Sequence, residues 1–432
     1  MSALLKSVLG LAAASAANVH GPGASCSRGS IFLCKRLAHA GDFAAGVKRR
    51  ALPTTTSIKY TIPTDAYLLA KKFQEVARQG KLDDAVAIVM QTKTRSQSVV
   101  VWNQVIEAYA QEGRLSRALR GYSEMRRRGF MPTPTTFTAL LKACALSESD
   151  KSQAVADELF DLMAAHGVEA SIINVNALLN VYQRKHDIDK MLARFNELPE
   201  DGPMAPALAT YTILLSSLRR ELLARLHELS GKPDADGEPR EKRPALRDDR
   251  RTALLKENVH RTFGALLQVW TSFAEDVDRR LKVPDEETPV LAIDAHIVNV
   301  VLKACHSVYK ENRSLGRKGL KVIEQVYGLD MTLRSQSCRA PDKTPTEAAA
   351  PLAVRLRQRK GRRDQVAKHP VLDNDTISLA LELCTRDGEY TKAVRFWRSL
   401  EANFGNELHP LKQAHIDKIE ALCARLSQPR PR

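Results

Sequence analysis

Residues 99–133 read VVVWNQVIEAYAQEGRLSRALRGYSEMRRRGFMPT, and this stretch decides the fold. Apolar residues recur every three or four positions on both sides of Gly113, which predicts two amphipathic helices joined at that glycine. Gly129 and Pro132 would then end the hairpin. The residues expected to face the core are Val101, Trp102, Val105, Ile106 and Tyr109 in the first helix, and Leu115, Ala118, Leu119, Tyr122 and Met125 in the second.

The hairpin pattern recurs along the chain. Trp102-Asn103 is followed 35 residues later by Phe137-Thr138, and further copies start near Leu69, Val175-Asn176, Tyr211-Thr212, Val298-Asn299 and Ile377-Ser378. Two helical turns after each start, on the same face, we expect buried residues: Val76, Tyr109, Cys144, Tyr182, Leu218, Cys305 and Cys384. Gly80, Gly113 and Gly388 would separate the two helices, and Ala85, Ala118 and Ala393 would let them approach closely. One hairpin cannot bury its apolar face alone, so the recurrence predicts an all-α solenoid of stacked helix-turn-helix units.

The unit at 99–133 resembles the repeat of the pentatricopeptide repeat family. The matching residues are Tyr109, Gly113, Ala118, Met125, Gly129 and Pro132, which stand where that family's 35-residue repeat places them. The units at 134–171 and 172–207 match in part, and those beginning near 66, 208, 295 and 374 are degenerate. A tetratricopeptide repeat is the nearest alternative, but it needs a small residue where this chain has Ile106 or Leu141.

Composition divides the chain into segments. Residues 1–58 contain one acid, Asp42, among seven Lys and Arg, which predicts a mitochondrial presequence for import into the matrix; a secretory signal is the weaker alternative. Seven cysteines without a CxxC pair favour a reducing compartment. We expect helical repeats over 59–230, a charged insertion at 231–250, and repeats over 251–332 that open with a helix from about Arg251 to Leu281. A basic, proline-containing linker at 333–369 and a C-terminal repeat with a capping helix at 370–428 would follow.

The sequence contains no specific catalytic or metal motif. Cys144, Cys305 and Cys384 share one repeat position, which predicts core packing. Asp373 and Asp375 flank the start of a helix, where acids more often cap the helix than hold Mg²⁺. We therefore expect no enzyme activity, no cofactor and no small-molecule substrate. No apolar run approaches 18 residues, so no membrane span is expected.

A small polar residue follows the first core position of each unit. These residues are Asn103, Thr138, Asn176, Thr212, Asn299 and Ser378. In the resembled family this residue faces a concave groove and reads one RNA base, with Asn tending toward pyrimidines and Thr toward purines. The second determinant there is the last residue of the repeat, usually Asp or Asn, whereas this chain has Ser98, Thr133, Ser171 and Ala207. The resemblance thus implies RNA contacts by the polar residues, with Thr133 and Ser171 beside them. The alternative is that they are ordinary polar helix residues.

Basic clusters suggest phosphate contacts. The chain has a formal net charge of +16, which points to nucleic acid or another acidic partner. Arg126, Arg127 and Arg128 end one helix, and a basic run occupies 355–363. Such residues would bind phosphates without sequence preference. The alternative for each cluster is a solvated surface.

These observations lead to one main functional hypothesis. The chain would bind single-stranded mitochondrial RNA, mRNA or rRNA, and act in its processing, stability or translation. The alternative is a protein scaffold associated with the mitoribosomal small subunit or another complex. A nuclease is a third class, and the missing carboxylate cluster argues against it.

Overall fold

The computed structural model of the chain describes residues 63–230, 245–282, 287–289, 291–327 and 373–386, with isolated positions between 393 and 424. The regular elements of these residues are all helical, as predicted. They are α2 (Ala66–Arg78), α3 (Leu82–Gln91), the 3-10 turn η2 (Thr94–Ser96), α4 (Val99–Gln111), α5 (Leu115–Arg127), α6 (Pro134–Leu146), α7 (Ser152–Ala165), α8 (Ile172–Arg184), α9 (Ile188–Asn196), α10 (Leu208–Ser230), α11 (Ala245–Lys282), α12 (Ala295–Tyr309), α13 (Arg313–Gly316), α14 (Lys318–Tyr327) and α16 (Asn374–Arg386).

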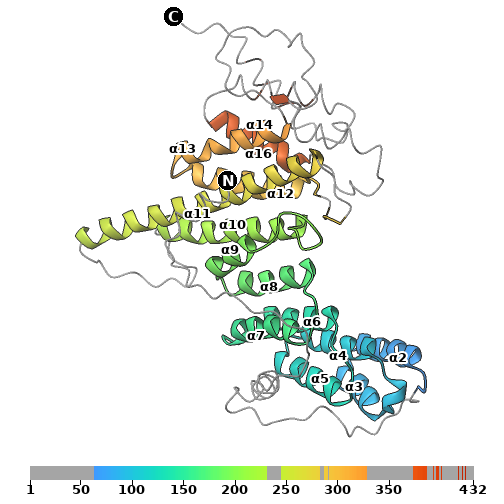
Figure 1. Cartoon of the computed structure of the whole chain (residues 1–432). Coiled ribbons are helices and arrows are strands. Elements are labelled where there is room, and N and C mark those ends of the chain that lie inside the picture. Colours follow the sequence, from blue (N-terminus) through green and yellow to red (C-terminus); the bar gives the residue numbers. More distant parts are fainter. Residues whose placement is uncertain are drawn as a thin grey trace, which may run out of the picture.

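The helices stack as hairpins in chain order, from α2 at the lower right of Figure 1 to α14 and α16 at the top. The first helices of the units, α2, α4, α6, α8, α10, α12 and α16, pack against one another in one layer. The second helices pack against their own partners and the next first helix, without comparable contact among themselves. Because the first helices contact one another directly from unit to unit, we call them the inner layer. The fold is therefore an α-solenoid.

Turn residues separate the two helices of each hairpin. Gly80 and Gly113 have φ angles of 76° and 68°, a conformation that side chains other than glycine rarely adopt. At Gly113 a Cβ atom would also lie 3.1 Å from the carbonyl oxygen of Leu146 in the next unit. His186 takes the equivalent place between α8 and α9, in the fourth unit, with a φ of 58°. Gly388, the third glycine predicted to break a hairpin, lies outside the described residues.

The predicted core positions are buried. The residues two turns after each unit start, from Val76 to Cys384, are all at most 3% exposed. Trp102 is fully buried, and its indole Nε1 donates to Gln97 Oε1 at 3.2 Å. Ala85 and Ala118 are also fully buried where the helices meet. Each buried large apolar side chain stabilises the fold by roughly 1.5–3 kcal/mol, so the continuous core supplies the main driving force for stacking.

One boundary expectation was wrong. We expected a charged insertion over 231–250 and a helix from about Arg251, but α11 already begins at Ala245. Residues 245–250 contain neither glycine nor proline, and Pro244 directly precedes the helix, so nothing in their backbone chemistry prevents helix formation. The expected end near Leu281 agrees with the observed Lys282. The segments 1–58, 231–244 and 333–369 lie outside the described residues.

The long helix α11 extends beyond its neighbours. It has 38 residues against 23 in α10, and in Figure 1 its first half projects to the left of the stack. Apolar residues at helical spacing, including Phe263, Trp270 and Phe273, bury its second half. None of the described helices combines the length and the apolar character needed to cross a membrane.

Candidate nucleic-acid interface

A polar column runs along the first-helix layer. It consists of the residues that follow the first core position of each unit: Asn103, Thr138, Asn176, Thr212, Asn299 and Ser378. Five of these side chains are partly exposed, whereas Asn299 is only 5% exposed. The column therefore reaches solvent over the first four of these units and is closed at Asn299.

An exposed column lies one helical turn before the polar column, on the same face. It contains three exposed apolar side chains, Tyr67 (75% exposed), Val100 (59%) and Ile173 (64%). Its other members are also exposed: Thr135, Ala209, His296 and Asp375. Sequence reasoning missed this column, although apolar residues outside the core stripe of a helix were the available signal.

An arginine column lies further along the same helices, at the last residue of α2 and of α8 and in the middle of α10. Arg78, Arg184 and Arg220 each stand eleven residues after a member of the exposed column, which is close to three turns of 3.6 residues. All three are exposed and form no ion pair with a described residue. Between α2 and α4 the columns line an open depression of about 640 Å³, with Tyr67, Arg78 and Val100 in its wall. This solvent-facing side of the first-helix layer is the groove.

The polar column also connects neighbouring units. Thr136 Oγ1 donates to Asn103 Oδ1 at 2.6 Å, and Thr210 Oγ1 donates to Asn176 Oδ1 at 2.7 Å. At the junction between these two, Asn174 Nδ2 donates to Thr138 Oγ1 at 2.8 Å. The partner residues Thr136, Asn174 and Thr210 are fully buried. We call this series of bonds the junction ladder; it ends at Thr212, whose hydroxyl donates to Leu208 O of its own helix.

Thr133 and Ser171 cap the helices that follow them. Thr133 Oγ1 accepts a 3.3 Å hydrogen bond from Asn103 Nδ2, so the two predicted RNA-contacting residues of this unit lie together. Ser171 Oγ donates to Asn174 Oδ1 at 2.8 Å, and through Asn174 it connects to Thr138. The structure therefore brings each of these end-of-repeat residues next to its polar-column residue.

Two acidic residues occupy the same end-of-repeat place in the later units. Asp294 precedes α12 and caps it by accepting from the backbone N–H groups of His296 and Ile297. Asp373 precedes α16, accepts from Thr376 N at 2.7 Å, and so caps that helix as predicted. Sequence reasoning missed both as end-of-repeat residues, because insertions interrupt the 35-residue register in the sequence that precedes them.

Asp373 closes the polar column at Asn299. Asn299 Nδ2 lies 3.0 Å from both carboxylate oxygens of Asp373, 74 residues away in sequence. Burial raises the pKa of the Asp373 carboxyl, but hydrogen bonds from Thr376 and Asn299 outweigh that effect and lower it below the ordinary value. The amide of Asn299 is thus bound by a carboxylate of the chain itself.

The three arginines 126–128 are occupied by contacts within the chain. Arg126 lies 3.3 Å from His166 Nδ1, and Arg127 forms two hydrogen bonds with Glu124, at 2.7 and 2.8 Å. Arg128 donates to Glu124 and to Met90 O, and its guanidinium lies 5.4 Å from the Trp102 ring centroid. The side chain of Arg127 is 74% exposed and that of Arg128 15% exposed, so Arg127 is far more accessible to a ligand than Arg128.

The described residues gather no cluster of three His, Cys, Asp or Glu side chains that could hold a metal ion. Cys144, Cys305 and Cys384 are fully buried, as predicted for core residues. Burial raises the pKa of the Cys144 and Cys305 thiols to about 12, so both are protonated at neutral pH. Asp375, the other acid considered for Mg²⁺, lies 3.4 Å from Lys303 Nζ.

Two parts of the repeat region match known protein families. Residues 97–145 match the PPR repeat family, and residues 158–219 match the pentatricopeptide repeat domain. A chloroplastic pentatricopeptide repeat-containing protein of Arabidopsis thaliana is 25% identical over 279 residues, which cover 59% of this chain and 28% of the relative. A mitochondrial one from the same plant is 28% identical over 164 residues, covering 37% and 24%. The chain therefore spans less than a third of the length of these relatives.

A solved structure of a pentatricopeptide repeat protein is also similar to this chain. The crystal structure of the pentatricopeptide repeat protein PPR10 in complex with an 18-nt psaJ RNA element superposes with a TM-score of 0.33 and 17% identity, covering 92% of this chain and 54% of that one. The two matched repeat regions coincide with helices α4 to α6 and α7 to α10. The chain belongs to the pentatricopeptide repeat family.

Proposed function

We propose that the chain binds single-stranded RNA along the groove, with one base for each unit from α4 to α10. One observation carries the proposal: an exposed residue, a polar residue and, in several units, an arginine recur at fixed spacing on the inner helix layer. A nucleotide presents three parts that match these three kinds of residue: the base face, the base edge and the phosphate. Apolar side chains such as Val100 and Ile173 suit base faces, the polar column suits base edges, and the arginines suit phosphates.

The junction ladder predicts which polar residue contributes most to RNA binding. Asn176 uses its Oδ1 to accept from Thr210, and both N–H groups of its amide are without a partner among the described residues. Asn103 uses its Oδ1 and one N–H group within the chain. Asn176 therefore has more hydrogen-bonding capacity left for a base edge than Asn103.

The test is RNA affinity in matched variants. We expect N103A/T138A/N176A to weaken binding of the cognate RNA by roughly 1–3 kcal/mol for each base edge that is no longer recognised, with N176A the largest single effect. The control S116A/S123A/N196A removes exposed polar side chains from the second helices α5 and α9, and it should bind like the wild type. Unchanged affinity in a folded triple groove variant would refute base reading. Ultraviolet crosslinking with sequencing of the bound RNA would supply the cognate sequence.

The cellular role proposed here is in the mitochondrial matrix, in processing, stability or translation of an organellar transcript, without catalysis by the chain itself. Its support is the acid-poor composition of residues 1–58. Mass spectrometry of the endogenous protein should find residues 1 to about 58 absent from the mature form. An intact N-terminus, or residence of the full chain in the cytosol, would contradict this assignment.

A scaffold role in a mitoribosomal or other complex is the second candidate. The specific observation in its favour is the closed polar column at Asn299, where Asp373 takes the place of an external ligand. Under this alternative naked RNA binds weakly and without sequence preference, and crosslinks are confined to rRNA. A short discrete footprint on an mRNA would exclude it.

A further inference from the structure

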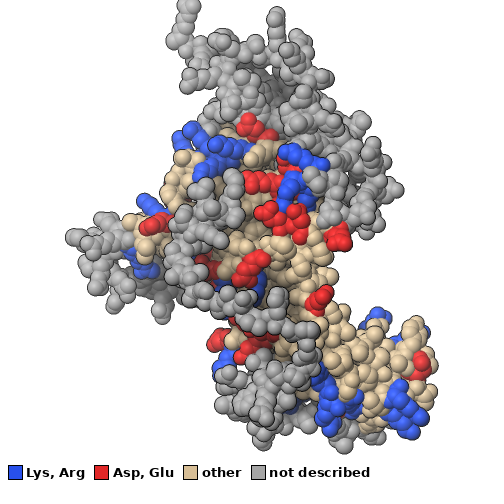
Figure 2. Space-filling view, viewed as in Figure 1, with Lys and Arg blue, Asp and Glu red and all other residues tan. Residues whose placement is uncertain are grey.

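A second cationic surface lies at the far end of the array, in the layer of second helices. We define it by Arg313, Lys318 and Lys321, which are all exposed, with the exposed Arg317 beside them. Residues 313–321 contain no acid. Arg313, Lys318 and Lys321 form no ion pair with any described residue. Figure 2 shows Lys and Arg side chains gathered over the region of α13, at the upper left.

Helix stability does not explain these charges. Lys318 and Lys321 lie in the first turn of α14, and neither α13 nor α14 has an acid in its first turn. The N-terminal end of a helix carries a positive partial charge, so lysines there are electrostatically unfavourable. Lys318 and Lys321 are one turn apart and point outward, whereas Leu320, Val322 and Ile323 are buried. The basic side chains therefore form an external surface, and their positions add repulsion to the helix start.

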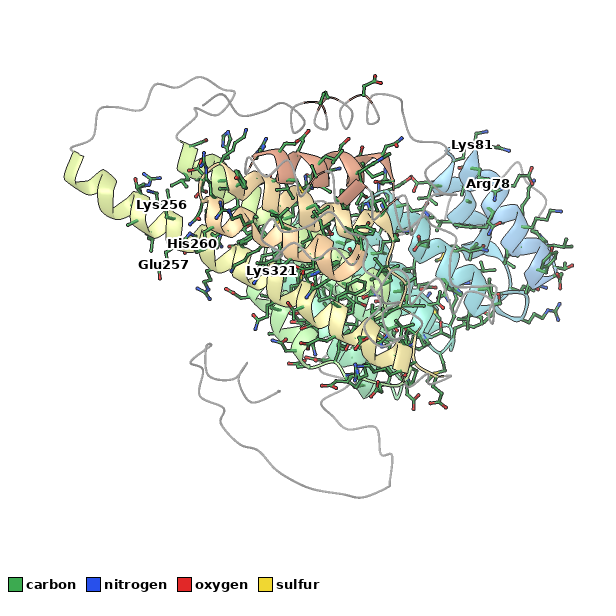
Figure 3. All side chains as sticks on the ribbon, turned by 90° about the horizontal axis from the view of Figure 1, so that it is seen from above. Arg78, Lys81, Lys256, Glu257, His260 and Lys321 are labelled. Carbon is green, nitrogen blue, oxygen red and sulfur yellow. The ribbon has the colours of Figure 1, made fainter. Side chains whose placement is uncertain are left out.

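The surface continues toward α11. Asn312, the cap of α13, lies 3.3 Å from His260 Nε2 of α11. Lys256, His260 and Arg261 are exposed on the projecting half of that helix, with Glu257 as the acid among them. Figure 3 shows Lys256, Glu257 and His260 on α11 and Lys321 on α14. Two adjacent second helices thus present cations on the side opposite the groove layer.

The composition of the surface favours a polyanion over a protein. Protein interfaces have exposed aromatic or aliphatic anchors at their centre. The large apolar side chains exposed among the described residues are Tyr67, Leu68, Val100, Met131, Ile173, Leu223 and Leu254. None lies between 291 and 327, and Leu254 is the one member on α11, at the outer edge of the surface, two residues before Lys256. The surface also lacks the exposed and polar columns that recur along the groove. It can bind phosphates but offers no repeated side chains for unstacked bases.

We infer that this surface binds the phosphate backbone of a folded, double-helical RNA segment that flanks the single strand in the groove. Double-helical RNA hides its base edges and presents phosphates and 2′-hydroxyls, which matches a surface of cations without base-reading side chains. The inference depends on the proposed RNA binding by the groove. It adds a second class of contact, which is specific for RNA shape. This contact lies at the end of the array where the Asn299 amide is already bound by Asp373 and does not read a base.

The experiment compares two RNAs and three proteins. One RNA is the unstructured cognate sequence, and the other carries the same sequence joined to a short hairpin. The proteins are the full-length wild type, R313Q/K318Q/K321Q, and the control K81Q/K93Q/R95Q, which removes three exposed cations without an ion pair from the first hairpin unit. Circular dichroism confirms that each variant keeps its helix content. We expect the hairpin to increase wild-type affinity several-fold, and this increase to disappear only in R313Q/K318Q/K321Q.

Salt dependence gives a second readout. For the hairpin RNA, the slope of log affinity against log salt should fall by roughly 0.7–0.9 for each phosphate that is no longer neutralised. If the hairpin adds nothing to wild-type affinity, or if the increase in affinity given by the hairpin is lost in both variants, this inference is wrong while groove binding stands. If the wild type binds neither RNA, the proposed function itself fails. The hairpin should also act from one end of the strand and not from the other, because the surface lies at one end of the array.

Discussion

Thr136 Oγ1 donates a 2.6 Å hydrogen bond to Asn103 Oδ1, and this bond joins two consecutive units at the floor of the groove. The donor is fully buried and the acceptor is partly exposed. A residue predicted from sequence to contact RNA therefore also helps to fix how one unit sits on the next. The same arrangement recurs between Asn176 and Thr210. RNA recognition and unit stacking are thus coupled through the same side chains.

Removing the buried hydroxyl should reveal this coupling. T136V replaces the hydroxyl by a methyl group and leaves Asn103 Oδ1 without its donor, so we expect a decrease of about 1–2 kcal/mol in the free energy of unfolding. N103A removes the acceptor, and the double variant N103A/T136V should be destabilised by less than the sum of the two single changes. Urea denaturation of all four proteins measures the interaction energy. Strict additivity would show that the bond does not stabilise the junction.

The sequence was sufficient for the repeats that follow one another closely. The period of about 35 residues and the spacing of Trp102, Val105 and Tyr109 predicted the hairpins and their core, because helix geometry alone fixes which residues share a face. The beginning of α11 was missed because polar, charged residues such as Arg247 and Asp248 suit both a solvated helix and a loop. Composition could not decide between them.

The site was predicted only in part. The polar column could be located from its period, but Asp294 and Asp373 could not be matched to their units, since insertions interrupt the register that precedes them. The roles of Arg126, Arg127 and Arg128 were equally hidden. The sequence shows only three adjacent charges. In the structure Arg126 contacts His166, Arg127 contacts Glu124, and Arg128 lies over the Trp102 ring.

Arg128 should prove important for stability. Its guanidinium lies over Trp102 and donates to Met90 O at 3.1 Å, and its side chain is only 15% exposed. We expect R128A to lower the free energy of unfolding by about 1–3 kcal/mol, since it removes packing, a cation–π contact and a hydrogen bond together. The exposed neighbour Arg127 serves as the control, and R127A should leave the denaturation midpoint unchanged. Equal midpoints for the two variants would contradict the structural role of Arg128.

The carboxyl of Asp373 should make the α12–α16 contact sensitive to acid. Its pKa is lower in the folded chain than in an unfolded one, so its ionised form stabilises the fold above the ordinary Asp pKa of about 3.9. That contribution disappears as the pH falls through the lower, folded pKa. The wild type should therefore exceed D373N in thermal midpoint at neutral pH, and the difference should shrink below about pH 4. D375N, at an exposed position, is the control; a difference independent of pH would show that the charge is irrelevant.

Cys144 and Cys305 should resist alkylation in the folded protein. Both are fully buried, and burial raises each thiol pKa to about 12, so the reactive thiolate is scarce at neutral pH. Iodoacetamide treatment followed by peptide mass spectrometry should leave both unmodified under native conditions and label both in urea. Rapid native labelling of either residue would show that its unit opens readily.

The arginine column, more than the three arginines at 126–128, should account for phosphate binding in the groove. Arg78, Arg184 and Arg220 are exposed on the inner helix layer, whereas Arg126 and Arg128 are held by His166, Glu124 and Met90 O. Each phosphate contact on a single strand contributes about −0.7 to the slope of log affinity against log salt, so R78Q/R184Q/R220Q should flatten that slope by roughly 2. Base preference should be retained, because phosphate contacts position the RNA and base contacts specify it.

The comparison variant for this prediction is R126Q/R127Q. It avoids Arg128, whose replacement would also affect stability, and it should change the slope by less than half as much as the column variant, because both side chains already have partners in the chain. Affinity is measured on the unstructured cognate RNA over a range of potassium chloride concentrations. A larger change in R126Q/R127Q than in R78Q/R184Q/R220Q would move the phosphate path from the inner layer to the ends of the second helices, and the groove assignment would have to be abandoned.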